Sequence, residues 1–157
     1  MGILEWLFNT SLAEIVRSTT WAYPWVNAFH SVGMGFLVGV IFMVSFRVLG
    51  FGRFSIAPFQ RFSVVIWSAF ALSLATGFAL FAANAPAFFS SPTFRIKVLF
   101  LVLAGVTAWM LWRNVFRDGA AWSATGDAPR AHKIIAGVSV VFWLGAVFAG
   151  RMTAYLP

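Results

Sequence analysis

Hydrophobic residues occur along this chain in four long runs, over residues of about 22–46, 62–83, 92–113 and 128–151. Each run is long enough for a helix that crosses a bilayer, which needs about 20 apolar residues. Backbone polar groups inside a bilayer must pair within their own segment, and a helix achieves this. The pattern therefore predicts an all-α, polytopic membrane protein: a four-helix bundle that forms a single membrane domain over residues 1–157.

The segments between the runs are rich in glycine, proline, small polar and charged residues, so we expect them to be connecting loops, over residues 47–61, 84–91 and 114–126. Ser91 precedes Pro92, and Asp127 lies two residues before Pro129. A capping side chain followed by a first-turn proline is typical of a helix start. We therefore expect the third and fourth membrane helices to begin at these two places.

Residues 1–19 precede the first run and have a mixed pattern. They carry Glu5 early and no basic residue before Arg17, which is unlike a signal peptide. Ser11 and Glu14 have the spacing of a capping box, so a short helix is expected from about residue 12. One side of this helix is apolar, and we interpret residues 1–19 as an N-terminal interfacial helix that lies along the membrane surface.

Small residues recur at four-residue spacing within three of the runs, and such ridges allow membrane helices to approach closely. The first run carries Ser31, Gly35 and Gly39, the second Ala69, Ser73 and Gly77, and the fourth Gly145 with Ala149 and Ala146 with Gly150. We expect these ridges to form the contacts between helices in a compact bundle.

Composition agrees with a membrane location. Hydrophobic residues make up 61% of the chain and charged residues only 10%, against about 25% charged in soluble domains. The net charge of +7 comes from residues at the ends of the apolar runs, so it indicates topology and not a nucleic-acid partner. Cysteine is absent, which excludes disulfides, thiolate ligands and covalent haem attachment through CxxCH.

The basic residues also predict orientation, because they are retained on the cytoplasmic side. One side of the membrane would hold seven of them: Arg47, Arg53, Arg61, Arg113, Arg117, Arg130 and Lys133. The other side would hold four: Arg17, Arg95, Lys97 and Arg151. This excess places both termini outside.

His30 is the one side chain away from the ends of the predicted spans that titrates near neutral pH. Tyr23, Asn27, His30 and Met34 follow one another at helical spacing and so share one helix face. The imidazole is a candidate ligand of haem or a metal ion, with Asn27 or Tyr23 fixing its tautomer through the other ring nitrogen. A hydrogen bond between helices, and proton or quinone chemistry, remain open as alternatives.

If His30 binds a haem iron, the sequence offers no evident second ligand at the membrane depth of His30. His132 lies at the very start of the fourth run, beside Arg130 and Lys133 at the inner surface, so the two imidazoles should lie about 20 Å apart along the membrane normal. We interpret His132 as an interfacial residue. Met34 shares the helix face of His30 and so cannot bind the iron from the opposite side, which leaves Met152 as the better thioether candidate. The second ligand could also come from a second copy of the chain or from a partner subunit.

Basic side chains are expected at the same membrane depth as His30, because Arg95 and Lys97 begin the third span and Arg151 ends the fourth, followed by Tyr155. These side chains could hold haem propionates, a lipid headgroup or another anion. The alternative is that they snorkel to water. Thr76 and Gly77, near the outer end of the second span, could complete the wall of this site.

Several activities are excluded by what the sequence lacks. It has no GxGxxG, P-loop or HExxH motif, and no Asp or Glu within the predicted spans. Nucleotide binding, zinc-dependent proteolysis and transport coupled to protons or sodium are therefore not indicated. We expect a subunit that does not turn over a substrate by itself.

The motifs around these residues resemble those of a family of small uncharacterised bacterial four-span membrane proteins. They are Trp21-Ala-Tyr-Pro24, Asn27-Ala-Phe-His30 with Gly33, Thr76-Gly77-Phe, Pro92-Thr-Phe-Arg-Ile-Lys97 and Gly150-Arg151 through Tyr155. More distantly, the arrangement is similar to the membrane domain of copper-resistance D proteins and other cytochrome-b-like four-helix modules. This resemblance implies an inner-membrane location and a site facing the periplasm. The chain departs from it by lacking a second histidine at matching depth and a methionine-rich copper motif.

The sequence therefore supports two hypotheses. In the first, the chain is a redox-associated inner-membrane subunit that binds haem b or copper near the periplasmic side through His30. In the second, it is a structural accessory subunit of a larger membrane complex without a cofactor. Lipids, and other membrane subunits or a second copy of the chain, are the expected partners.

Overall fold

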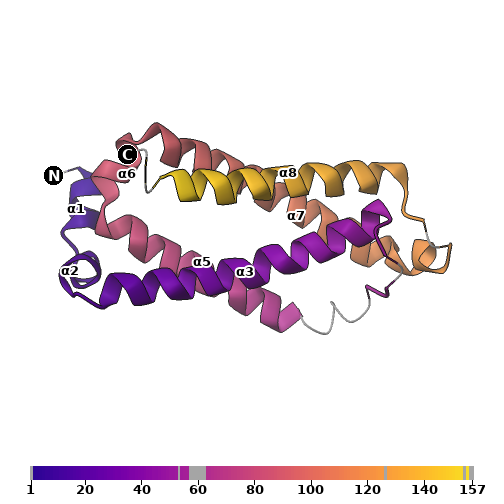
Figure 1. The fold of residues 1–157 in the computed structure, drawn as a ribbon, viewed down its shortest axis with the longest axis horizontal. Coiled ribbons are helices and arrows are strands. Elements are labelled where there is room, and N and C mark those ends of the chain that lie inside the picture. The colour runs from indigo at the N-terminus through magenta and orange to yellow at the C-terminus, as the bar shows by residue number, and fades with distance from the viewer. Residues whose placement is uncertain (1, 53, 57–62, 126, 154, 156–157) are drawn as a thin grey trace.

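The computed structural model describes residues 2–52, 54–56, 63–125, 127–153 and 155. These residues form helices and no strands, which confirms the predicted all-α class (Figure 1). The helices are α1 (Ile3–Phe8), α2 (Ser11–Ser18), α3 (Ala22–Leu49), α5 (Ser63–Ala83), α6 (Ala85–Ser90), α7 (Pro92–Thr125) and α8 (Arg130–Met152).

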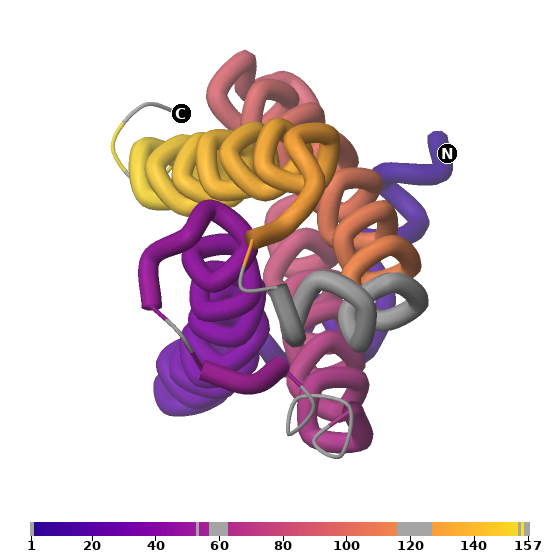
Figure 2. The backbone as a smooth tube through the Cα atoms, turned by 90° about the vertical axis from the view of Figure 1, so that its right-hand side faces the viewer, coloured from indigo at the N-terminus to yellow at the C-terminus, as the bar shows by residue number. Residues whose placement is uncertain are grey.

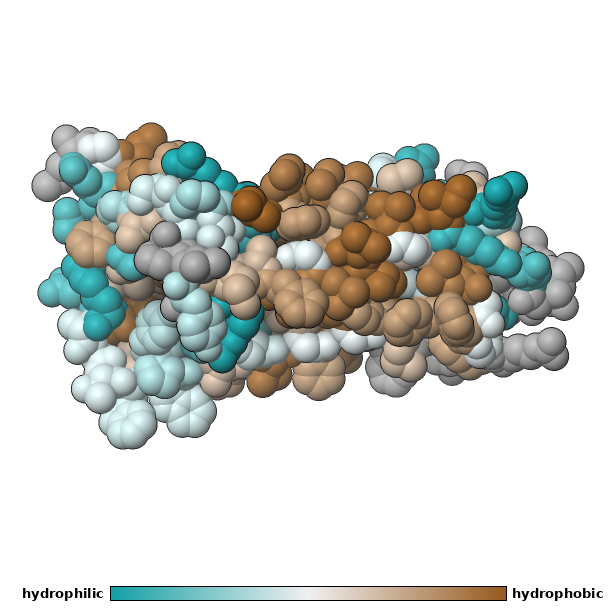
Figure 3. Space-filling model, turned by 45° about the horizontal axis from the view of Figure 1, so that its top comes forward, coloured by the Kyte–Doolittle hydropathy of each residue, from teal (hydrophilic) through white to brown (hydrophobic). Residues whose placement is uncertain are grey.

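Within the described part of the chain, four helices are long and apolar enough to cross a membrane: α3, α5, the part of α7 over Pro92–Val115, and α8. Their ends lie within three residues of the predicted spans. On the face shown in Figure 3, apolar side chains cover the middle of the molecule and hydrophilic ones gather toward the two ends. This distribution is that of a multi-pass membrane protein.

The four long helices pack around a common centre (Figure 2). α3 packs along α5, α7 packs along α8, and α3 also contacts α8. Leu37 of α3, Ala104 of α7 and Trp143 of α8 form one buried cluster. A second cluster, nearer the C-terminal end of α3, is formed by Val44, Val48, Ile56, Leu111, Val115, Ala128 and Ala136. The core is therefore shared by three helices, and α5 joins the bundle mainly through α3.

The N-terminal segment forms two short helices where one was predicted. Thr10, and not Ser11, caps α2, because its hydroxyl accepts the backbone N–H of Ala13 at 3.3 Å. Val16 of α2 is buried against Ala79 and Ala83 of α5. This packing holds α2 against the C-terminal end of α5 and the N-terminal end of α3. Its predicted position along the membrane surface remains a prediction.

The connections differ from the predicted loops in two places. The segment over 84–91 contains α6, and the segment over 114–126 continues α7 as a helix to Thr125. In the first case, Asn84 interrupts the helical backbone with φ −147° and ψ 40°, so the chain starts a new helix after a single residue. The polar residues of the second segment extend the helix beyond the apolar run, because helix formation needs no apolar residues outside a bilayer.

The two expected helix starts have different outcomes. Ser91 caps α7 as predicted, since its hydroxyl accepts the backbone N–H of Phe94 at 3.3 Å. Asp127 does not cap α8, whose N-cap is Pro129 and has no side-chain cap. Instead the Asp127 carboxylate accepts a hydrogen bond from Lys133 Nζ at 2.6 Å. This ion pair lowers the pKa of Asp127 below its usual value.

The predicted small-residue ridges are confirmed in α5 and α8 and wrong in α3. Ala69 and Ser73 of α5 are buried toward α3. In α3, Gly35 and Gly39 face open space, with no atom within 4 Å of an added Cβ. Gly33 makes the contact with α5 instead. The spacing indicated the wrong face of α3, because Ser31, Gly35 and Gly39 follow one another at four-residue spacing, whereas Gly33 stands between the large residues Phe29 and Leu37.

Candidate functional site

His30 lies in the N-terminal half of α3, is half-buried and faces α5. Its Nδ1 atom lies 3.0 Å from the Ser73 carbonyl oxygen and 3.2 Å from the Thr76 hydroxyl. A carbonyl oxygen only accepts hydrogen bonds, so Nδ1 carries the proton and donates it. In the neutral ring Nε2 then has a free lone pair. No described residue forms a hydrogen bond with Nε2.

Two glycines allow this close approach. A Cβ on Gly77 would lie 3.0 Å from His30 Cε1, so the ring rests on the α5 backbone. A Cβ on Gly33 would lie 2.7 Å from Ser73 Oγ and 3.0 Å from the Ala69 carbonyl oxygen. Only glycine at both positions lets α3 and α5 pack closely enough for the imidazole to reach the Ser73 carbonyl. Thr76 and Gly77, which we expected in the wall of the site, both contact the His30 ring.

This geometry predicts the tautomer of His30. In ¹⁵N spectra of histidine-labelled protein, which has two histidines, His30 should show a protonated Nδ1 and a bare Nε2. Gly77→Val should displace the ring and move the His30 signals while the His132 signals stay. Ala75→Val, at an exposed position of the same helix, is the matched control. A protonated Nε2 in the unchanged protein would contradict the assignment.

Lys97 lies in the second turn of α7, close to Phe94, whose ring stacks on Phe81 of α5, one turn after Gly77. The Lys97 side chain is half-buried. Its stem lies over Gly150 of α8, where an added Cβ would be 3.3 Å from Lys97 Cε. Its ammonium lies 5.7 Å from the ring centroid of Phe94. No carboxylate or other hydrogen-bond acceptor among the described residues contacts this ammonium.

The other predicted cations have partners elsewhere. Arg95 is exposed; its Nε donates to the Phe89 carbonyl at 3.0 Å, and its guanidinium lies 5.8 Å from the Phe89 ring. Arg151 donates to the Tyr155 hydroxyl at 3.4 Å, and both side chains are exposed. Of the four residues that we predicted around His30, three therefore contact other groups, and Lys97 is the one whose charged group has no hydrogen-bond partner among the described residues.

Three further predicted residues have no described contact with the His30 ring. Tyr23 is 46% exposed, and Asn27 is exposed as well. The partners of Nδ1 are groups of α5, in the place that we predicted for Asn27 or Tyr23. Met152, the predicted thioether ligand, is 41% exposed at the end of α8. No contact described in the structure joins it to His30.

His132 lies in the first turn of α8, far from His30. α3 and α8 are antiparallel, since Leu49 at the end of α3 lies against Gly137 near the start of α8. The 19 residues from His30 to Leu49 span about 28 Å at about 1.5 Å per residue. The two histidines therefore cannot bind one iron, as the sequence predicted. His132 is buried among its neighbours, and its expected position at the membrane interface stays a prediction.

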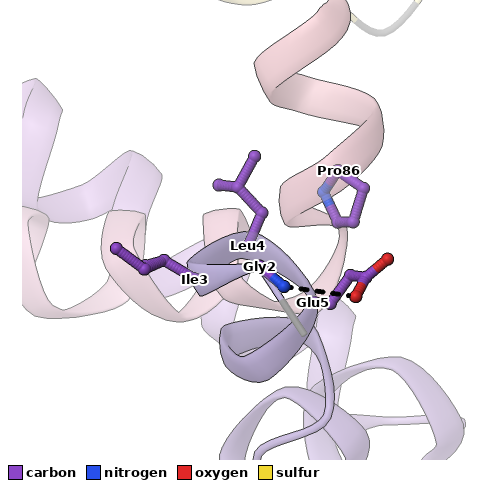
Figure 4. A pocket seen from close by; sticks show the side chains of 5 residues that line it. All are labelled: Gly2, Ile3, Leu4, Glu5 and Pro86. Carbon is purple, nitrogen blue, oxygen red and sulfur yellow. Dashed lines mark hydrogen bonds between the residues drawn. The ribbon is translucent and has the colours of Figure 1, made fainter.

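The described residues contain no group of three or more His, Cys, Asp or Glu side chains that could hold a metal ion. A hollow of about 410 Å³ lies between α1 and α6 and is lined by Gly2, Ile3, Leu4, Glu5 and Pro86 (Figure 4). The Glu5 carboxylate there accepts a hydrogen bond from the backbone nitrogen of Gly2 at 3.3 Å. None of the predicted site residues lines this hollow. The candidate site is therefore the arrangement of His30, Ser73, Thr76, Gly77 and Lys97.

No family model, curated protein or solved structure matches this chain. The resemblance to small four-span bacterial membrane proteins therefore remains a prediction, and the functional argument depends on the geometry around His30.

Proposed function

We propose that the chain is a non-catalytic, redox-associated membrane subunit that binds haem b through Nε2 of His30. The observation that carries this proposal is the orientation of the imidazole. Its Nδ1–H is held by the Ser73 carbonyl, and Nε2 has no partner among the described residues. Histidines that bind metals commonly donate their other N–H to a carbonyl or carboxylate, which fixes the ring and raises its basicity.

Haem b fits the available residues better than copper does. A copper site draws several ligands from the protein, and the described residues offer no cluster of three His, Cys, Asp or Glu side chains. A porphyrin brings four equatorial nitrogens of its own, so a single imidazole is enough to hold its iron. Met152, a second copy of the chain or a partner subunit would complete the coordination. When bound, haem would supply one-electron transfer.

We place the protein in the bacterial inner membrane, with both termini and the His30 end of the bundle on the periplasmic side. The support is the excess of basic residues at the other end. Alkaline phosphatase fused after residue 157 should be active, whereas green fluorescent protein fused there should be dark. Fusions after Asp127, between α7 and α8, should give the opposite result. The reverse pattern would contradict this orientation.

The test of the proposed function is the absorption spectrum of the detergent-purified chain, oxidised and then reduced with dithionite. Soret and alpha bands that shift on reduction, with about one haem per chain or per pair of chains, are expected. A colourless, iron-free preparation from cells supplied with haem would overturn the proposal.

A structural accessory subunit is the second candidate. The hydrogen bond from His30 to Ser73 favours it, because this bond ties α3 to α5 without any ligand. Lipids and neighbouring membrane subunits would then be the partners. In this case the preparation is colourless, and His30→Ala lowers only the stability of the bundle.

A further inference from the structure

Lys97 differs from the other cations at the His30 end of the bundle. Arg95 and Arg151 each donate a hydrogen bond to another residue, and both are exposed. Lys97 is half-buried, and no acceptor among the described residues contacts its ammonium. Its stem is held against Gly150 of α8. The contact with Gly150 holds the Lys97 side chain in place, but it gives the ammonium no hydrogen-bond acceptor or counter-charge.

An ammonium in such a place is destabilised unless an anion accompanies it, because a charge partly removed from water loses hydration. The Phe94 ring, 5.7 Å away, offers only a weak attraction. The chain has four acidic residues, and none of those described forms an ion pair with Lys97. An anion from outside the chain would therefore be bound more strongly here than at either arginine.

Lys97 also lies at the His30 end of the bundle. Phe94, whose ring lies 5.7 Å from the Lys97 ammonium, stacks on Phe81 of α5 with ring centroids 5.3 Å apart. Phe81 follows one turn after Gly77, on which the His30 ring rests. The histidine and the lysine come from different helices, and Gly77 and Gly150 provide the backbone surfaces on which their side chains rest. A ligand that offers an electrophilic centre to Nε2 and an acid group to Nζ would satisfy both side chains at once.

We infer that Lys97 binds a carboxylate arm of the group that His30 holds, and that it thereby selects ligands carrying such an acid. This inference rests on the proposed function, in which the ligand is haem b and the arm is a propionate. Arg95 has no part in this selection. Arg95 and Lys97 are two residues apart on a helix, so they project to different sides of α7.

The experiment compares haem b with haem b dimethyl ester, in which both propionates are blocked, as ligands of the cofactor-free full chain in detergent. The unchanged chain should bind the free acid about tenfold to a hundredfold more tightly than the ester, as expected for a hydrogen bond to a charged group. Lys97→Met keeps the length of the stem and should bind both porphyrins with equal affinity. Arg95→Met is the matched control and should keep the preference of the unchanged chain.

The outcomes separate the two claims. Equal binding of both porphyrins by the unchanged chain, or a preference that survives Lys97→Met or is lost in Arg95→Met, overturns the inference and leaves haem binding by His30 intact. A chain that binds neither porphyrin overturns the proposed function as well. If Lys97→Met fails to fold, Gly150→Ala replaces it. Its Cβ would meet Lys97 Cε at 3.3 Å, displace the ammonium and reduce the preference for the free acid. An unchanged preference in this variant overturns the inference.

Discussion

Replacing His30 by alanine should remove haem from the purified protein, with at least about a tenfold loss of reduced-minus-oxidised absorbance per chain. The reason is that the described residues offer no second imidazole near His30, since His132 lies close to the opposite end of the bundle. Alanine also removes the hydrogen bond to the Ser73 carbonyl, so some loss of thermal stability is expected beside the loss of haem.

His132→Ala is the matched control because the chain has two histidines. It should keep the haem bands in the fraction of protein that folds. Because His132 is buried, its removal is expected to lower stability as well, so haem must be counted per folded chain. Equal haem loss in both variants would mean that ligation by His30 does not explain the bands.

Replacing Gly33 by valine should destabilise the bundle by about 3 kcal/mol, the upper part of the range for overpacked contacts. A Cβ at this position would lie 2.7 Å from Ser73 Oγ and 3.0 Å from the Ala69 carbonyl oxygen. The second of these atoms belongs to the α5 backbone, which cannot move aside as a side chain can. α3 and α5 would have to separate, and His30 would lose its contact with the Ser73 carbonyl. Unfolding in mixed micelles, followed by tryptophan fluorescence, measures the change.

Gly35→Val introduces the same side chain on the same helix, two residues away, where no atom lies within 4 Å of the added Cβ. Its effect should be smaller than about 1 kcal/mol, because valine at an open, lipid-facing position meets no neighbour. Similar losses at positions 33 and 35 would contradict the described packing of α3 on α5.

The membrane helices could be predicted from the sequence because their signal is simple. A run of about 20 apolar residues without charge has few stable arrangements other than a membrane helix. The end of α7 could not be predicted in this way. Residues 114–126 lie beyond the apolar run, and polar residues in a helix outside the bilayer carry no hydropathy signal. α6 was missed because a helix over 85–90 is too short for a periodic pattern.

The rotation of each helix was harder to predict than its position. In a soluble bundle the apolar face identifies the side that packs, but lipid and neighbouring helices are equally apolar. Small residues are then the remaining signal, and α3 has them on two faces. Gly33 packs on α5, whereas Gly35 and Gly39 do not. Only the tertiary structure distinguishes these alternatives.

The site was predicted in part. His30, Thr76, Gly77 and Lys97 were all named from the sequence. Ser73 was named only as a packing residue, because its contribution to the site is a backbone carbonyl, which no residue type reveals. The separation of Arg95 from Lys97 could have been foreseen, since residues two apart on a helix point to different sides.

The most direct measurement of the central claim, that Nε2 of His30 ligates haem, is the rescue of His30→Gly by free imidazole. This variant leaves a space beside Ser73 and Gly77 that imidazole can fill. We expect the cofactor-free variant to bind haem weakly without imidazole and to regain the bands of the unchanged protein as imidazole is added. A variant that binds haem fully without imidazole, or that never recovers the bands while remaining folded, would contradict the claim.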